Sequence, residues 1–277
     1  MRLAEGRARA RAAEPDPPRD PVAVAWELLR DATGLPGALN MAVDQALLDR
    51  AERTGAATLR LYRWKPACLS FGRHEPATRR YDRTLIERLG IDVVRRPTGG
   101  RAVWHEHEVT YAVAAPVARF GSLRASYRAI HELLARALRR LGAEVTLAPD
   151  RPEPEPRDRP GACFATPGGG ELVVAGRKLV GSAQVRQGGA LLQHGSILLA
   201  GAQDLVDRVS REPGATGGAT TLARVLGRTV SFGEVADAVS AAFGCEPETE
   251  PATLTPDARA PESLINSFLD PSWTWRR

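Results

Sequence analysis

The segment over residues 162–199 constrains the fold most, because three apolar runs follow one another there with only short glycine turns between them. Short apolar runs bounded by glycine are typical of β-strands, and short turns join strands that are neighbours in one sheet. The segment therefore predicts a meander of three strands, over residues 171–175, 179–186 and 190–199.

Helix-like periodicity precedes this meander. Residues 123–141 place apolar side chains three and four positions apart on one face and end at Gly142, and residues 39–53 show similar spacing. Other strands are expected at residues 58–64, 68–72, 92–95, 102–104, 109–115 and 144–147, with a strand or first helical turn at 22–29. Shorter helices are expected at residues 81–89, 204–209, 220–226, 232–243 and 261–268.

The 277 residues suffice for one large domain with a small appendage. We expect a disordered lead rich in Arg, Ala and Pro at residues 1–21, a main domain at 22–245 whose part after about residue 202 is helical, and a C-terminal tail at 246–277. The proline-rich run at residues 149–160 predicts an exposed loop inside the main domain.

Composition excludes several classes of protein. The sequence has no apolar run of about 18 residues and no secretory signal, so we expect no membrane span. Three widely spaced cysteines indicate neither a disulfide framework nor a CxxC metal pair, and they favour a reducing cytoplasm. The net charge of +5 is spread among acidic residues without a basic-aromatic cluster, so an acidic protein partner is favoured over nucleic acid.

Cys163 and Lys178 are the candidate catalytic pair. Only two of the 38 basic residues are lysines, Lys65 and Lys178, and lysine can exchange a proton where arginine cannot. Cys163 follows the proline-rich loop and precedes a glycine-rich turn, where a thiol is accessible as a nucleophile. We expect Lys178 to favour the thiolate and shuttle its proton. The alternatives are a solvated lysine and an inert loop thiol.

Two further motifs suggest a binding site. The turn from Arg95 to Arg101 could present backbone N–H groups to an oxyanion, although a plain hairpin turn fits equally well. His105 and His107 would share a face of a strand, but no third ligand stands at a useful spacing, so no metal is expected. His194 is either a base near a cleft or a buried, hydrogen-bonded histidine.

Four stretches together resemble the biotinyl/lipoyl protein ligase and transferase catalytic domain, abbreviated BPL/LplA/LipB. They are LNMAVDQALLDR at residues 39–50, TLRLYRWKPACLSFG at 58–72, RRPTGGRAVWHEHEVTYAV at 95–113 and GRKLVGSAQVRQGGALLQHGSILL at 176–199. The resemblance covers about residues 22–245. It implies an α/β (α+β) fold, in which a mixed, largely antiparallel sheet is flanked by helices and followed by a short helical tail.

Within that superfamily the sequence is most similar to octanoyltransferases of the LipM type. The resemblance implies a cytoplasmic, monomeric enzyme without cofactor or metal. It would move octanoyl from octanoyl-acyl-carrier protein, through a Cys thioester, to a lysine of a lipoyl domain such as glycine-cleavage H protein or an E2 subunit. Cys163, in a CF-x-x-P context with Phe164 and Pro167, would be the nucleophile and Lys178 its partner. The implied substrate-binding residues are Arg95, Arg96, Thr98, Gly99, Gly100, His105, Gly181, Ser182, Ala183, His194, Gly195 and Ser196.

Three alternatives stay open. An ATP-dependent lipoate ligase usually has a third glycine where this chain has Arg101 and an Asp-x-Gly-Asn stretch where it has residues 106–109, and it needs no cysteine at position 163. An amidotransferase that moves acyl groups between lipoyl domains would use the same cysteine, so the motifs do not separate it. A non-catalytic lipoyl-domain-binding module would bind without forming an adduct.

Overall fold

A computed structural model describes residues 25–149, 163–164, 167–214, 218–245 and 260–276. The expected lead at residues 1–21 and most of the expected proline-rich loop lie outside these ranges. Cys163 and Phe164 lie within them. Among the helices that are described, none combines the length and apolar composition that a membrane crossing requires.

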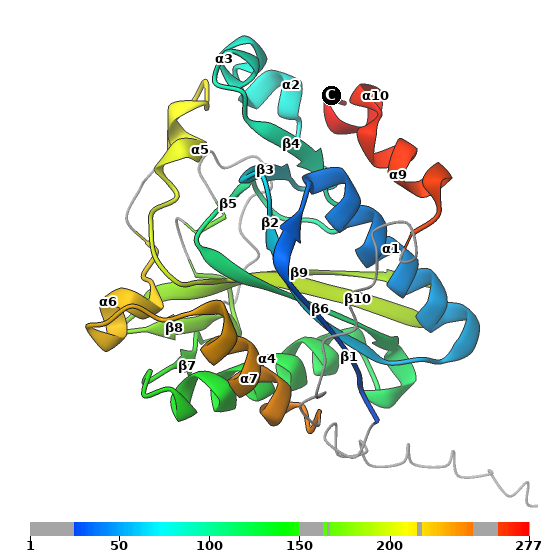
Figure 1. Cartoon of the computed structure of the whole chain (residues 1–277), viewed down its shortest axis with the longest axis vertical. Coiled ribbons are helices and arrows are strands. Elements are labelled where there is room, and N and C mark those ends of the chain that lie inside the picture. Colours follow the sequence, from blue (N-terminus) through cyan, green and yellow to red (C-terminus); the bar gives the residue numbers. More distant parts are fainter. Residues whose placement is uncertain (1–24, 150–162, 165–166, 215–217, 246–259, 277) are drawn as a thin grey trace, which may run out of the picture.

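A seven-stranded sheet forms the centre of the molecule (Figure 1). Its spatial order is β1 (Glu27–Leu35), β2 (Thr58–Trp64), β6 (Glu108–Pro116), β10 (Ala190–Leu198), β9 (Arg177–Gln187), β8 (Leu172–Val174) and β7 (Thr146–Leu147). Only β1 and β2 pair in parallel; the other neighbours are antiparallel. The structure confirms the mixed sheet and the expected meander, which is β8, β9 and β10.

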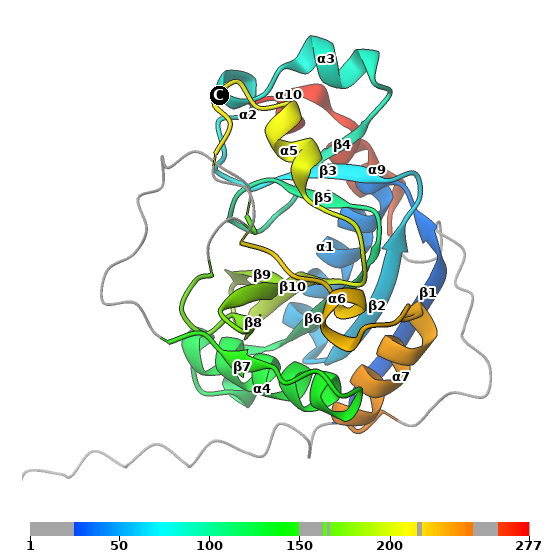
Figure 2. The same cartoon turned by 90° about the vertical axis from the view of Figure 1, so that its left-hand side faces the viewer.

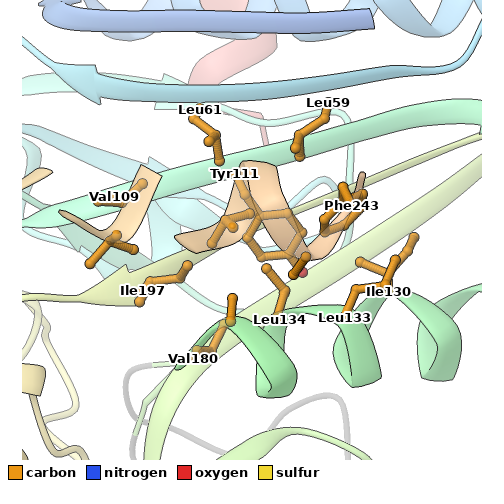
Figure 3. Close-up of a cluster of buried hydrophobic side chains, with 14 of the residues drawn as sticks. Leu59, Leu61, Val109, Tyr111, Ile130, Leu133, Leu134, Val180, Ile197 and Phe243 are labelled. Carbon is orange, nitrogen blue, oxygen red and sulfur yellow. The ribbon is translucent and has the colours of Figure 1, made fainter. Parts of the chain in front are cut away.

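Helices α4 (Leu123–Arg140) and α7 (Phe232–Ala242) cover one face of this sheet (Figures 1 and 2). Ser122 caps α4 by accepting a hydrogen bond from the Ala125 N–H, and Ser231 and Glu234 form a capping box on α7. Their apolar faces meet sheet residues such as Leu59, Tyr111 and Val180 in the main hydrophobic core (Figure 3). Burial of this kind stabilises a fold by about 25 cal/mol per Å² of apolar surface.

Helix α1 (Gly37–Thr54) lies on the opposite face and packs with α9 (Glu262–Leu269) and α10 (Pro271–Thr274) in a second core. Pro36 precedes the first turn of α1, and Gly55 ends the helix in the left-handed conformation. The described part of the expected C-terminal tail therefore packs on the body of the domain.

A three-stranded sheet, ordered β4 (Asp92–Arg95), β3 (Cys68–Phe71) and β5 (Val103–His105), lies beyond the large sheet (Figure 2). Helices α2 (Ala77–Arg80), α3 (Arg83–Arg88) and α5 (Asp204–Arg208) belong to this end, and η2 (Val117–Arg119) and α6 (Leu222–Leu226) complete the described elements. The space between the two sheets holds the candidate site.

Two predicted elements differ from the structure. The helix expected at residues 81–89 begins later, as α3 at Arg83, because Tyr81 pairs as an extended residue with Ser210 and Asp82 caps the helix; the short helix α2 before it was not expected. The strand or helical turn expected at residues 22–29 is a strand that begins later, β1, and it continues to Leu35 beyond an irregularity in its pairing. There the Asp31 carboxylate accepts hydrogen bonds from the N–H groups of Thr33 and Gly34.

Candidate active site

A narrow cavity lies where the large and small sheets face each other. It is lined by Met41, Tyr62, Trp64, Ser70, Arg96, Val103, His105, Thr110, Cys163, Gly181, Ser182, Ala183, His194, Gly195 and Ser196. Most of the expected site residues are in this set. Five expected residues do not line it: Arg95, Thr98, Gly99, Gly100 and Lys178. Lining residues that were not expected include Met41 on α1, Tyr62 and Trp64 on β2, and Ser70 on β3.

Cys163 and Lys178 are in contact. The Lys178 Nζ lies 3.6 Å from the Cys163 Sγ and donates a hydrogen bond of 2.8 Å to the Cys163 carbonyl oxygen. Lys178 is on β9, and the Cys163 N–H donates to the Ala102 carbonyl beside β5, so both sheets position the pair. Cys163 is half-buried while Lys178 is buried, which leaves the sulfur as the more accessible partner.

Glu171 is a third member of this cluster. Its Oε1 lies 2.7 Å from the Lys178 Nζ, and its Oε2 accepts a 2.6 Å hydrogen bond from the Gly168 N–H. Burial by itself lowers the pKa of Lys178, but attraction to Cys163 and Glu171 outweighs it and raises the pKa above its ordinary value. Lys178 is therefore a cation beside the sulfur, and its expected role as a proton shuttle stays a prediction.

Glycine at position 181 leaves room for this cluster. A Cβ there would lie 2.8 Å from Phe164 Cζ and 3.1 Å from Lys178 Cε. The Lys178 Nζ in turn lies 5.2 Å from the centroid of the Phe164 ring. The Phe164 side chain and the aliphatic part of Lys178 thus occupy the space that any larger residue at 181 would need.

This packing gives a testable expectation for Gly181→Ala. The new methyl group must displace Phe164 or Lys178, so we expect acyl transfer to fall by about 10- to 100-fold, as small misplacements of reacting groups do. Gly189→Ala is the matched control, because a Cβ at Gly189 meets nothing within 4 Å. Steady-state transfer rates and thermal unfolding of both variants check this, and equal rates in the two variants would contradict it.

Arg96 is a buried cation at the other side of the cavity. Its guanidinium donates to the Gly99 carbonyl at 2.8 Å, to the Arg101 carbonyl at 2.7 Å and to Ser70 Oγ at 3.1 Å. No carboxylate pairs with it among the residues that the structure describes. Burial lowers the pKa of Arg96, while attraction to Cys163 opposes this. The Gly99 and Arg101 carbonyls of this turn thus point at the Arg96 guanidinium.

Arg95 does not line the cavity, contrary to expectation, because it points away from the side occupied by Arg96. Its guanidinium donates to the Gly72 and Glu75 carbonyls at 2.7 Å each and to the Thr274 carbonyl at 3.0 Å. The Trp273 indole N–H donates back to the Arg95 carbonyl at 2.9 Å. Burial lowers the pKa of Arg95 to about 10. Arg95 therefore ties the C-terminal segment to the turn that carries Arg96.

His194 lines the cavity but is a buried, hydrogen-bonded histidine. Its Nδ1 lies 2.8 Å from Asp44 Oδ2 and its Nε2 lies 2.6 Å from Thr98 Oγ1. Burial lowers the pKa of His194, although Asp44 opposes the shift. Asp44 is also paired with Arg60 at 2.7 Å. Of the two readings that the sequence left open for His194, the structure supports the buried, hydrogen-bonded one, and Thr98 is its partner.

His105 and His107 do not share a site. His105 ends β5, stacks on Trp64 with ring centroids 4.0 Å apart and contacts Glu108 and Ser70, whereas His107 is exposed in the turn before β6. The described residues contain no group of three His, Cys, Asp or Glu side chains that could hold a metal ion.

The fold and the motifs at the site define the class of protein. A family model described as the lipoyl protein ligase A/B catalytic domain matches residues 36–244. The chain therefore belongs to this family, as the motifs at residues 95–113 and 176–199 predicted.

Curated relatives narrow the class further. Octanoyltransferase LipM of Kyrpidia tusciae is 39% identical over 274 residues, which cover 91% of this chain and 99% of the relative. Octanoyltransferase LipM of Geobacillus kaustophilus is 35% identical and covers 91% of this chain and 98% of its own length. These relatives confirm the predicted octanoyltransferase class of lipoate biosynthesis, an acyltransferase.

Solved structures confirm the predicted fold. A lipoate-protein ligase A bound with ATP superposes with a TM-score of 0.73 at 21% identity and covers 90% of this chain and 98% of its own. A structure from Thermoplasma acidophilum, described as a bi-partite lipoate protein ligase and its E2 lipoyl domain, gives a TM-score of 0.68 at 20% identity and covers 91% of this chain and 97% of its own.

Proposed function

We propose that this chain transfers an octanoyl group from octanoyl-acyl-carrier protein to a lysine of a lipoyl domain, through a thioester on Cys163. The contact of 3.6 Å between the Cys163 Sγ and the Lys178 Nζ, at the edge of the cavity, carries the proposal. A cation at this distance favours the thiolate, which is the reactive form of cysteine. The apolar walls from Met41, Val103 and Trp64 suit a hydrocarbon chain.

In the first half-reaction the Cys163 thiolate attacks the thioester carbonyl of the donor. A bond forms between Sγ and the acyl carbon, and the carrier protein's thiolate leaves and takes a proton. The tetrahedral intermediate carries a negative oxygen. Lys178 and Arg96, both buried cations that interact with Cys163, would stabilise that charge.

In the second half-reaction the ε-amine of the acceptor lysine attacks the acyl-Cys163 carbonyl. The carbon–nitrogen bond forms, the carbon–sulfur bond breaks, and the Cys163 sulfur regains its proton as the amide product leaves. The description of the Thermoplasma acidophilum structure, which names a lipoate protein ligase and its E2 lipoyl domain, supports a lipoyl domain as acceptor. The net charge of +5 favours encounter with acidic carrier and lipoyl domains.

A comparison of acyl donors tests this proposal. We expect wild-type protein to octanoylate a lipoyl domain when octanoyl-acyl-carrier protein is the donor and no ATP is present. Octanoate with ATP is the matched ligase donor, and an octanoylated H protein is the matched amidotransferase donor. Mass spectrometry of the lipoyl domain gives the readout. Transfer that depends strictly on ATP would contradict the proposal. A preference for octanoylated H protein would show that this protein, and not octanoyl-acyl-carrier protein, is the donor.

A non-catalytic binding module is the candidate from a different class. It predicts a stable complex with the lipoyl domain and no acyl adduct on the chain. The buried Lys178–Glu171 pair beside an accessible thiol disfavours it, because two buried charges are costly in a surface that only binds.

A further inference from the structure

The proposed second half-reaction needs a base, and this inference rests on that proposal. The acceptor lysine has an ordinary pKa of about 10.4, so it arrives as an ammonium group that must lose a proton before it attacks. Lys178 is not free to take that proton, because it already holds its own in an ion pair with Glu171 at 2.7 Å. Another group that faces the cavity must accept it.

Three hydroxyl–imidazole pairs border the cavity. Ser70 Oγ lies 2.7 Å from His105 Nε2, Thr98 Oγ1 lies 2.6 Å from His194 Nε2, and Ser182 Oγ lies 2.8 Å from His131 Nε2. The opposite ring nitrogen, Nδ1, meets an acceptor in each case: Glu108 at 2.8 Å, Asp44 at 2.8 Å and the Gly170 carbonyl at 2.7 Å. Each neutral imidazole therefore holds its proton on Nδ1 and accepts from the hydroxyl at Nε2.

Two of these pairs are poor bases. Thr98 does not line the cavity, and Asp44 behind His194 is already neutralised by Arg60 at 2.7 Å. Ser182 lines the cavity, but only a carbonyl supports His131, and burial lowers the pKa of His131 to about 4. His131 therefore faces no carboxylate, and the Asp44 carboxylate that faces His194 is shared with Arg60.

The pair of Ser70 and His105 differs because the carboxylate behind it pairs with no lysine or arginine among the described residues. Both residues line the cavity, and Glu108 is buried with Oε1 accepting from His105, Ser196 and Thr110. Its Oε2 has no hydrogen-bond partner, and no lysine or arginine pairs with Glu108 among the described residues. The charge of Glu108 thus becomes compensated when His105 is protonated, which is the logic of a hydroxyl–imidazole–carboxylate triad.

We propose that Ser70, His105 and Glu108 form the base relay that deprotonates the incoming lysine. The ammonium group donates its proton to Ser70 Oγ as the Ser70 hydroxyl proton passes to His105 Nε2. The imidazolium pairs with Glu108, and the neutral amine then attacks the acyl-Cys163 carbonyl. His105 later releases the proton to solvent, so protons and charge balance over the half-reaction.

Arg96 connects this relay to the reacting thiol. Its guanidinium donates to Ser70 Oγ at 3.1 Å and interacts electrostatically with Cys163. Ser70 Oγ has two lone pairs. One accepts the hydrogen bond from Arg96, and the other remains for the incoming ammonium group, while the hydroxyl proton is donated to His105. The positive charge of Arg96 also disfavours the ammonium form of the lysine next to it.

The other titratable groups around the relay are neutral or paired. Tyr62 on β2 has its pKa raised by burial, and so has Cys68 on β3. His194 on β10 has its pKa lowered by burial. Glu108 and Arg96 are therefore the charges that face His105 from the elements packed against it.

Separate measurement of the two half-reactions tests the relay in Ser70→Ala and Glu108→Gln. The Gln variant is isosteric, and the oxygen it replaces by nitrogen can be the unpartnered Oε2. We expect acyl-enzyme formation from octanoyl-acyl-carrier protein to fall by no more than about tenfold, a loss that reflects the contact of Ser70 with Arg96. Transfer from isolated acyl-enzyme to a lipoyl domain should fall by about 10²- to 10³-fold at pH 7, the usual contribution of a general base.

The pH profile separates this role from a structural one. Without the relay, transfer should depend on the fraction of free amine, so the defect shrinks as the pH rises toward 10. Ser240→Ala is the control, because Ser240 is a buried serine on α7 whose hydroxyl donates to the Ala236 carbonyl at 2.7 Å. Transfer at wild-type rates, or a defect equal in both half-reactions and at every pH, would overturn the relay. Absence of any adduct in wild type would instead refute the proposed function.

Discussion

Cys163→Ala is expected to abolish acyl transfer and to leave the fold intact. Removal of a covalent nucleophile closes the two-step route, so we expect a loss of at least about 10³-fold in kcat. The side chain is half-buried at the edge of the cavity, so truncation should barely change the melting temperature. Steady-state octanoylation of a lipoyl domain measures the loss, and calorimetry confirms the fold.

The chain supplies its own controls for this substitution. Cys68 and Cys245 are buried free thiols, and burial raises the pKa of both, that of Cys245 to about 11. Neither lies in the cavity lining. Cys245→Ala should therefore transfer octanoyl at the wild-type rate. Appreciable turnover by Cys163→Ala would show that the acyl group does not pass through this thiol.

Lys178→Met should lower both stability and activity, because it leaves Glu171 as an uncompensated buried charge. Loss of one member of a buried ion pair costs about 3–5 kcal/mol of unfolding free energy. The thiolate also loses its neighbouring cation, so we expect acyl-enzyme formation to fall by about 10²-fold or more. Denaturant unfolding and single-turnover acylation give the two quantities.

The double variant Lys178→Met with Glu171→Gln separates the two effects. It removes both charges, so most of the lost stability should return while acylation stays low. Recovery of acylation together with stability would show that Lys178 has only a structural role. Because the pKa of Lys178 is raised above its ordinary 10.5, the wild-type ion pair stabilises the fold below about that pH. This stabilisation is lost as the pH rises through the folded-state pKa, a loss that the double variant should not show.

Local patterns in the sequence predicted the meander and the helices well. Glycine turns and apolar runs depend on neighbours in the chain, so β8, β9 and β10 and the amphipathic α4 follow from them directly. The rare lysine and the loop cysteine were also predicted as a pair. This pairing could be predicted because only a few residue types can serve as a nucleophile or as its basic partner.

The partners of buried charges could not be predicted in the same way. Glu171 precedes a short strand, where an acidic residue suggests solvent, and only the pairing of β8 with β9 brings it to Lys178. Ser70 and Glu108 belong to different sheets, so their meeting at His105 depends on how the sheets pack. Arg95 was misplaced for the same reason, because the carbonyls it binds include Thr274 at the far end of the chain.

The most direct test of the central claim is the isolation and chase of the acyl-enzyme. Wild-type protein is incubated with octanoyl-acyl-carrier protein, freed of donor, weighed intact and digested to locate the adduct. We expect one octanoyl group on the peptide that contains Cys163, labile to hydroxylamine as a thioester, and lost to a lipoyl domain at a rate that matches turnover. An adduct that persists in Cys163→Ala, or one that the lipoyl domain does not remove, would contradict the account.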